Sequence, residues 1–420
     1  MCFCVHLRHI CIKKRCMRLC KTSNRNAIKW GWRTTAYFTL FTLLLSGCWD
    51  RKETNELSMI LAVGFDQLVD GTKEVSILCF VPGAGGGESG GQSGSSSGGR
   101  QGNIYRYTVI GRTATEAYSS IQQKITRRLF WAETKIVLFG ETLAKAGISD
   151  ELDFLFRNVE TREQMKLFLS ERTAKEKIYE LSDPNVVSLL ISFARDAKYR
   201  SYTLVEVMQG ISGESKAFFL PYLDTRKINV NLKQTGIWQE ADKIAVISQR
   251  KLAGSLEKKL AKGNLWLSPN LLRRIVGFPF GKDGQLVTLE ILSHKFRLSP
   301  QVSGNKWSME VRIDVEADVY QNTSNVNFFA PEDNLRKLEG PFNKEIQKEV
   351  ESVIEYLQTE ARADAIGFGH AFHCWYPSIW KREKANWNER FPSVETKVVV
   401  NSKIRRAGLS SLIKLTDPKK

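Results

Sequence analysis

Ser58-Met-Ile-Leu-Ala-Val-Gly-Phe65 is an apolar run of strand length, and it begins the pattern that decides the fold. Short apolar runs bounded by turn residues predict buried β-strands. Val75-Ser-Ile-Leu-Cys-Phe-Val81 follows after a polar turn and predicts the neighbouring strand. Two strands in quick succession therefore open the first folded region.

Helix and strand patterns alternate after this pair. Thr113 and Glu116 have the spacing of a capping box and predict a helix that runs to about Arg128. Thr173 and Glu176 repeat that spacing before a predicted helix to Leu181. Further strands are predicted at residues 104–110, 135–139 and 164–169, with short helices at 141–146 and 150–157. Alternation of this kind predicts a mixed α/β domain.

The pattern changes after about residue 222. Residues 227–256 predict short strands separated by turns. Strict alternation predicts strands over 286–296 and 307–320, and a last strand is predicted at 394–404. Apolar residues at helical spacing predict one long amphipathic helix over 334–361. A long helix between strands implies a sheet with a helix packed on one face, so the predicted fold class is α/β (α+β), multi-domain, with mixed β-sheets.

The segment from residue 83 to residue 102 is almost entirely Gly and Ser. Such a composition cannot bury apolar surface and predicts a flexible loop. It is not a nucleotide-binding loop, because no Lys-Ser or Lys-Thr and no helix pattern follow.

The first 47 residues have the composition of a bacterial secretion signal. They contain nine Lys or Arg and no Asp or Glu, followed by the apolar run Ala36-Tyr-Phe-Thr-Leu-Phe-Thr-Leu-Leu-Leu45. This run is much shorter than the roughly 20 residues that a spanning helix needs. Leu45-Ser46-Gly47-Cys48 then matches the lipobox of exported lipoproteins. We expect cleavage before Cys48 and attachment of lipid, including palmitate, to that cysteine. The alternative is an ordinary signal anchor with a chance cysteine.

The leader is longer than usual, and Met17 would make a better start than Met1 because its basic residues lead directly into the apolar run. The predicted division is a signal peptide at 1–47, an N-terminal domain at 48–222 and a C-terminal domain at 223–420. Removing the leader lowers the net charge from +17 to +8, since its nine positive charges leave with it. That moderate charge suits an anionic membrane surface, and no nucleic-acid motif accompanies it.

Segments along the whole mature chain resemble the Ger(x)C lipoproteins, the C subunits of spore germinant receptors. Near the start these are Gly47-Cys-Trp-Asp-Arg-Lys-Glu-Thr-Asn-Glu-Leu57 and Ala62-Val-Gly-Phe-Asp66. In the middle they are 111–117, 139–147, 153–157, Lys251-Leu-Ala-Gly-Ser-Leu256 and Asn264-Leu-Trp266. Near the end they are Asp364-Ala-Ile-Gly-Phe-Gly369, Tyr376-Pro377, Trp380, Trp387, Phe391-Pro392 and Ile404-Arg-Arg-Ala-Gly-Leu409. The long Gly/Ser segment and the extended leader depart from the family pattern.

The resemblance implies a non-catalytic subunit on the outer face of the spore inner membrane. It would assemble with two polytopic subunits, of A and B type, in a receptor that senses small nutrients and triggers germination. It also implies three α/β domains, so the two-part division of the mature chain could split further near residues 195–225. A second class stays open, namely a solute-binding lipoprotein that feeds a membrane transporter. That protein would need a deep cleft with convergent polar groups.

No catalytic residue, cofactor or metal is predicted. The mature chain has three histidines, and only His370, His373 and Cys374 cluster with metal-like residue types. Gly367, Gly369, Trp375 and Pro377 argue against a helix there, which favours polar residues beside a turn over a metal site. Cys79 and Cys374 lie in distant segments and are expected to be buried free thiols rather than a disulfide.

Two groups of residues have a structural and a functional interpretation. Trp380 and Trp387 are expected in the core, with a partner-facing groove as the alternative. Trp49 and Asp50 follow the lipidated cysteine and suit either the membrane interface or the first packed segment. Positive charge gathers near the C-terminus at Lys381, Arg382 and Lys384, which predicts either a solvated face or a contact with a partner subunit.

Overall fold

The computed structural model describes residues 56–82, 102–181, 202–229, 234–268, 274–281, 285–324, 328 and 333–408. Cys48, Trp49, Asp50, the whole leader and residues 83–101 of the Gly/Ser segment lie outside the described residues. The lipid anchor, the start codon and the loop therefore stay predictions.

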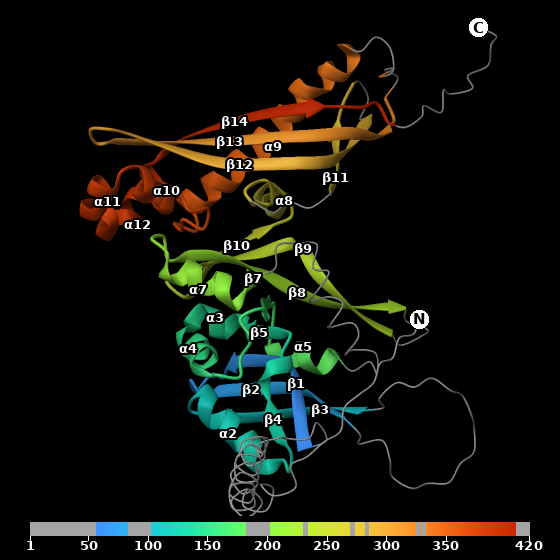
Figure 1. The fold of residues 1–420 in the computed structure, drawn as a ribbon, viewed down its shortest axis with the longest axis vertical. Coiled ribbons are helices and arrows are strands. Elements are labelled where there is room, and N and C mark those ends of the chain that lie inside the picture. Colours follow the sequence, from blue (N-terminus) through green and yellow to red (C-terminus); the bar gives the residue numbers. More distant parts are fainter. Residues whose placement is uncertain are drawn as a thin grey trace, which may run out of the picture. The chain divides into compact units, whose positions relative to one another are not determined.

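The first sheet has ten strands in the order β10-β9-β8-β6-β5-β1-β2-β3, with β4 beside β1 and β7 beside β6. Figure 1 shows how the strands and helices follow one another. The strands are β1 Leu57–Gln67, β2 Lys73–Pro82, β3 Gly102–Gly111, β4 Arg128–Phe130, β5 Ile136–Gly140, β6 Lys166–Ser170, β7 Tyr202–Thr203, β8 Ala217–Asn229, β9 Gln234–Ser248 and β10 Lys251–Glu257. Its helices are α2 Ala114–Lys124, α3 Glu141–Ala146, α4 Ser149–Arg157, α5 Ala174–Glu180 and α7 Leu204–Ser212.

Helices cover both faces of this sheet. The central strands β1, β5 and β6 are parallel and buried on both sides, which explains the continuous apolar runs in their sequences. On one face, Leu138 and Phe168 pack against Ala174 and Ile178 of α5. On the other face, the apolar sides of α2, α3 and α4 join the larger core. The α/β prediction is confirmed.

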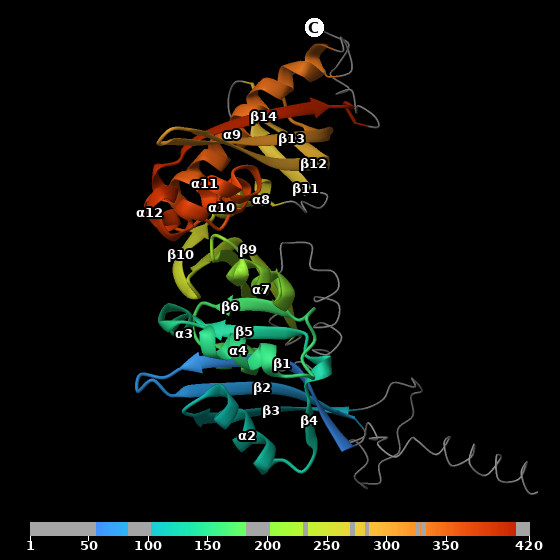
Figure 2. The same cartoon turned by 60° about the vertical axis from the view of Figure 1, so that its left-hand side comes forward.

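The second sheet has four strands in the order β11-β12-β13-β14. They are β11 Arg274–Pro279, β12 Leu286–Ser303, β13 Lys306–Asn322 and β14 Glu395–Ile404. The alternating apolar residues of β13 are buried, as the period of two requires. The long helix α9, Asp333–Thr359, packs against this sheet through its buried residues Leu338, Phe342, Ile346, Val350, Val353, Ile354 and Leu357 (Figure 2). The shorter helix α8, Lys259–Trp266, packs on α9.

A helical lobe, defined here as residues 368–393, connects α9 to β14. It consists of α10 Phe368–Trp375, α11 Pro377–Glu383, the 3-10 turn η3 Lys384–Asn386, α12 Trp387–Arg390 and the 3-10 turn η4 Phe391–Ser393. The expectation of a non-helical segment here is wrong. Gly367 is the N-cap residue of α10 and has a φ of +97°, which glycine adopts without strain. Pro377 is the first residue of α11, a position where its missing N–H costs nothing.

Two other predictions need adjustment, and a third is untested. The helix that follows Thr113 ends at Lys124, and residues 128–130 form β4. Residues 227–256 lie largely in the long strands β8 and β9 and in β10, instead of several short strands. The predicted domain boundary falls inside β8, and the division into domains stays a prediction. Among the described residues, no helix is long and apolar enough to span a membrane.

Candidate functional site

The C-terminal segment 364–369, singled out by the resemblance, forms a buried polar centre around Asp364. This side chain is 3% exposed and lies just before α10. Its Oδ1 accepts hydrogen bonds from the backbone N–H groups of Gly367 and Phe368, both at 2.9 Å. Its Oδ2 accepts from the N–H of Gly369 at 2.7 Å. Asp364 thereby satisfies N–H groups at the start of α10 that have no partner within the helix.

The same carboxylate joins the lobe to the first sheet. Its Oδ2 accepts a hydrogen bond from Trp387 Nε1 at 3.1 Å and another from the hydroxyl of Ser215. Ser215 lies in the turn between α7 and β8. A charged acceptor with several donors makes strong hydrogen bonds in a buried setting. We call Asp364, Ser215 and Trp387, with the donors at residues 367–369, the Asp364 hub.

Glu214, the residue before Ser215, makes a second connection to the lobe. Its Oε2 accepts from Trp380 Nε1 at 2.8 Å, and its Oε1 lies 2.9 Å from His373 Nδ1. Trp380 and Trp387 are 1% and 2% exposed, which confirms the core interpretation of both tryptophans. Gly369 is required between them, because a Cβ there would lie 2.8 Å from the ring of Trp380.

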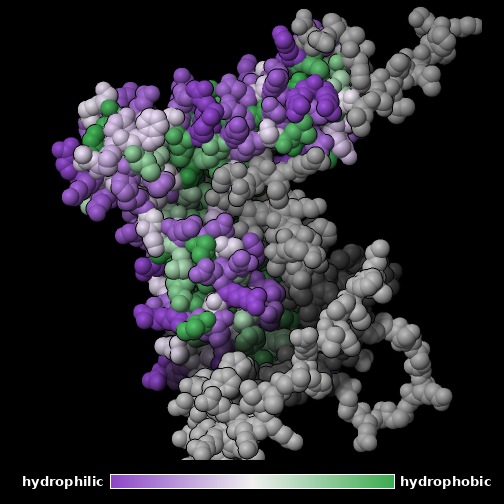
Figure 3. Space-filling model, viewed as in Figure 1, coloured by the Kyte–Doolittle hydropathy of each residue, from purple (hydrophilic) through white to green (hydrophobic). Residues whose placement is uncertain are grey.

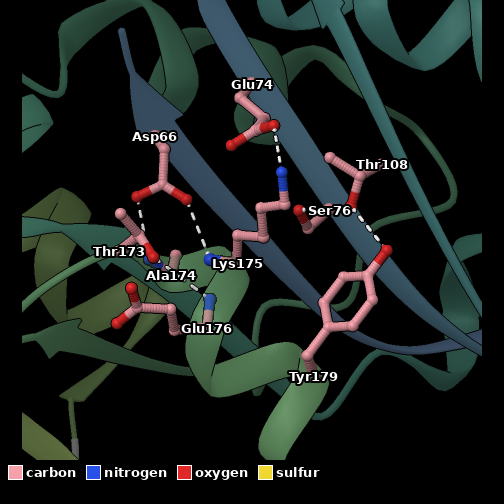
Figure 4. Close-up of polar contacts among 9 residues, drawn as sticks. All are labelled: Asp66, Glu74, Ser76, Thr108, Thr173, Ala174, Lys175, Glu176 and Tyr179. Carbon is pink, nitrogen blue, oxygen red and sulfur yellow. Dashed lines mark hydrogen bonds and ion pairs between the residues drawn. The ribbon is translucent and has the colours of Figure 1, made fainter.

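A second buried carboxylate, Asp66, organises the first sheet around the start of α5 (Figure 4). Its two oxygens accept from the N–H groups of Ala174 and Lys175, both at 2.8 Å. The hydroxyl of Thr173 accepts from the N–H of Glu176 at 3.1 Å, as the predicted capping residue should. The end of β1 is thereby bound to the first turn of α5.

Burial raises the pKa of Asp66 to about 6, although the two backbone hydrogen bonds oppose that rise. Gly140 approaches so closely that a Cβ there would lie 2.0 Å from Asp66 Oδ1. The neighbouring ion pair joins Lys175 Nζ to Glu74 at 2.7 Å (Figure 4). Asp66 and Asp364 therefore both use their carboxylate oxygens to accept hydrogen bonds from backbone N–H groups. Each side chain fixes the position of a helix start.

The three predicted contact residues lie on the outside of the helical lobe. Lys381 and Arg382 belong to α11 and Lys384 to η3, and all three are exposed. The nearby Glu383 is bound instead to Arg390, with an Oε2 to Nη2 distance of 2.9 Å. Within the described residues, no acidic side chain forms an ion pair with the three cations. Hydrophilic residues dominate the face shown in Figure 3, with apolar residues in small groups.

The histidine and cysteine cluster shows no metal geometry. His370 Nε2 lies 3.5 Å from Cys374 Sγ, one helical turn away, while His373 points to Glu214. Within the residues described by the structure, no group of three potential ligands could hold a metal ion. Cys374 is exposed, so the expectation of two buried thiols is wrong for it. It lies on the solvent side of a helix that the sequence did not predict. Cys79 is a free and buried thiol, and burial raises its pKa.

Sequence reasoning missed the residues that bind the lobe. Glu214 and Ser215 have no local signature, since their partners lie far along the chain. The sequence does carry a signal for the helix that precedes these two residues. Thr203 and Glu206 form a full capping box, with each side chain bonded to the other residue's backbone N–H, and it starts α7.

Comparisons with known proteins cover most of the chain. The family model "Spore germination protein N-terminal domain" matches residues 50–225, and "Spore germination B3/GerAC like, C-terminal" matches residues 242–408. Spore germination protein KC of Bacillus subtilis is 26% identical over 391 residues, which is 88% of this chain and 94% of the relative. Spore germination protein B3 of the same organism is 21% identical, covering 87% and 95% of the two chains.

A solved structure has the same fold. The crystal structure of the GerBC protein matches with a TM-score of 0.52 at 17% identity, covering 81% of this chain and 96% of that one. The two family models follow one another in the order that the sequence resemblance implied. The chain belongs to the Ger(x)C family of spore germination proteins.

Proposed function

We propose that this chain is the lipid-anchored C subunit of a nutrient germinant receptor, and that it works by protein contact with two polytopic membrane subunits. The observation that carries the proposal is the exposed trio Lys381, Arg382 and Lys384 on a lobe held in place by the buried Asp364 and the half-buried Glu214. Exposed charged side chains stay hydrated in the free protein, and on binding they direct the encounter with a partner and its orientation. Family membership in spore germination supports the same class of function. No catalytic step is proposed.

The position of the lobe follows from its internal bonds. Glu214 and Ser215, in the turn between α7 and β8, bind Trp380 and Asp364 respectively. Because the first of these contacts is half-buried and the second is buried, the lobe is oriented before any partner arrives. A preorganised surface loses less entropy on docking than a mobile one. The trio would thus present its charge in a fixed direction.

Charge reversal tests the docking surface. Lys381→Glu, Arg382→Glu and Lys384→Glu are combined in one variant, and spores are scored for nutrient-triggered germination. We expect germination to fall at least tenfold while the melting temperature stays within a few degrees, because exposed charges contribute little to folding. The matched control reverses Arg336, Lys344 and Lys348 on the exposed side of α9. Normal germination by the first variant, or equal loss in both, would refute this surface.

The anchor is tested separately at Cys48. We propose that the mature chain begins at this residue and carries diacylglyceryl lipid with palmitate chains, which retains it on the outer face of the spore inner membrane. Two long acyl chains are enough for stable retention. Intact mass of the membrane-extracted protein should show the lipid on residue 48. A mature start elsewhere, or retention of Cys48→Ala in the membrane, would contradict the anchor.

A further inference from the structure

Strand β3 is an edge strand that lacks the usual protection against pairing. It is hydrogen-bonded to β2 and to no other described strand. An edge strand presents a row of unpaired N–H and C=O groups, and proteins usually shield such edges with charge, proline, bulges or short length. β3 has ten residues, a single charged side chain at Arg106 and no proline.

The other three sheet edges carry such devices. β10 is short, contains charged residues at both ends, and the N–H of Ser255 donates to the hydroxyl of Tyr356. β11 has six residues, with Arg274 at its start and Pro279 at its end. β14 carries Glu395, Lys397 and Lys403. The contrast singles out β3.

The backbone of β3 is regular along its whole length. It pairs with β2 through ten successive residues, from Lys73 with Gly111 to Pro82 with Gly102, without a bulge. Most of the long antiparallel pairs in this chain, including β1 with β2 and β8 with β9, contain a register shift. Tyr105 is 39% exposed and Ile110 is 53% exposed, and Tyr105 stacks on Tyr107 with ring centroids 6.4 Å apart. β3 therefore offers a straight template with apolar side chains.

The sequence of β3 fits a second copy of itself. In an antiparallel pair about a two-fold axis at Tyr107, side chains of the same face meet across the axis. The opposed residues are Tyr107 with Tyr107, Tyr105 with Val109, Arg106 with Thr108, and Ile104 with Ile110. Aromatic, aromatic with β-branched and aliphatic pairs are those that stabilise antiparallel strands. Moving the axis by one residue, to Arg106, would place two guanidinium groups opposite each other and is disfavoured.

We propose that two copies of this chain pair edge to edge through β3, centred on Tyr107, and so join their first sheets into one. A two-fold contact of this kind is closed, because each copy uses the same strand and leaves no second free β3 edge. The buried residues of α2 and of α5 pack in the two apolar clusters of this sheet, whereas the proposed pairing uses the main chain at its edge. The occupant is therefore a second copy of this chain.

Cysteine cross-linking of the full chain in its membrane tests the register. Opposed residues of an antiparallel pair have Cα atoms roughly 4.5–5.5 Å apart, within the range that a disulfide spans. In a Cys374→Ser background, Tyr107→Cys should give a covalent dimer under mild oxidation. Val109→Cys is the matched control on the same face, because its two copies would be offset by four residues, roughly 13 Å along the strand. Absence of the dimer for residue 107, or equal dimer for both, overturns the proposal.

Sedimentation of the detergent-solubilised protein tests the contact without cysteines. The unmodified chain should sediment as a dimer, and Ile110→Lys should shift it to monomer. Val159→Lys, at a side chain that is 98% exposed elsewhere, should remain dimeric. A monomeric unmodified chain overturns the proposal, and so does an Ile110→Lys variant that stays dimeric. Loss of dimer with normal germination would separate this inference from the docking surface at Lys381.

Discussion

The hydroxyl of Ser215 donates a hydrogen bond to the carboxylate of Asp364 across 149 positions of sequence. Both side chains are buried, and the bond joins the turn after α7 to the start of the helical lobe. A buried bond between distant segments depends on the folded state of both. The orientation of the lobe is thus a property of the whole fold, and substitutions at this point should report on it.

Asp364→Asn should lower the free energy of unfolding by about 3 kcal/mol or more, because an amide nitrogen would face donors that now share a carboxylate. Denaturant titration followed by tryptophan fluorescence measures it, since Trp387 and Trp380 lie beside the site. Asp153→Asn removes an exposed carboxylate paired with Arg157 and serves as the control. The control should change stability by less than about 1 kcal/mol. Equal losses of unfolding free energy in the two variants would show that the Asp364 hub stabilises the fold no more than an exposed ion pair does.

Gly369→Ala and Gly277→Ala should have opposite signs. A Cβ at Gly369 would meet Trp380, Ser215 and Trp387 at 2.8–3.0 Å, whereas a Cβ at Gly277 in strand β11 would meet Thr288 Oγ1 at 3.7 Å, an ordinary contact distance. Overpacking costs about 1–3 kcal/mol, while alanine in place of a strand glycine gains roughly 0.5–1 kcal/mol. Thermal melts of the two variants should therefore move in different directions. If Gly369→Ala were stabilised, the side chains of Trp380 and Trp387 would have to move aside at little cost in packing energy.

Asp66 should make the protein less stable as pH rises from about 4 to about 7. Its folded-state pKa of about 6 lies above its ordinary value of 3.8, so between these values the folded state binds more protons than the unfolded state. Stability then falls with rising pH across this window and is level outside it. A shift of this size corresponds to roughly 1–3 kcal/mol.

Asp66→Asn isolates that contribution, because Glu151 and Glu349 also have pKa values raised by burial and act in the same sense. As pH rises from 4 to 7, the unfolding free energy of the unmodified chain should fall relative to that of Asp66→Asn. A difference that stays constant from pH 4 to pH 7 would refute the assignment to Asp66.

Of the two cysteines that the structure describes, one should react quickly with an alkylating reagent. Cys374 is exposed, whereas Cys79 is buried with a raised pKa and is both inaccessible and protonated. The lipid on Cys48 would leave no thiol there. Peptide mapping after brief labelling should find the label at Cys374, and Cys374→Ser should abolish it. Denaturant should then expose Cys79. Rapid labelling of Cys79 in the folded protein would contradict the burial of β2.

The sequence pattern predicted those elements whose buried face is set by their own apolar residues. The periods of β1, β13 and α9 follow from side chains on one face of one element, and the structure confirms each. Trp380 and Trp387 could be assigned to the core because large rings are seldom left in water. Lys381, Arg382 and Lys384 could be placed on the surface for the opposite reason, although their partner stays a proposal.

Long-range partnerships could not be predicted in the same way. Glu214 binds Trp380 across 166 positions, and nothing near Glu214 indicates it. Gly367 and Gly369 were interpreted as helix breakers, yet one lies before the first turn of α10 and the other gives room to Trp380. Their role depends on the ring packed against them. Tertiary packing therefore reversed the local preference at α10, and it also exposed Cys374.

The parallel pairing of β14 with β13 has a consequence for how the protein is made. β13 ends at Asn322 and β14 begins at Glu395, so α9 and the entire helical lobe are synthesised between two strands that lie side by side. Contacts separated by so much chain form slowly. A chain interrupted before residue 395 would leave β13, with 17 residues and a regular apolar face, as a bare edge prone to aggregation. A chain whose synthesis stops within the lobe would carry this bare edge, and only completion of β14 covers it.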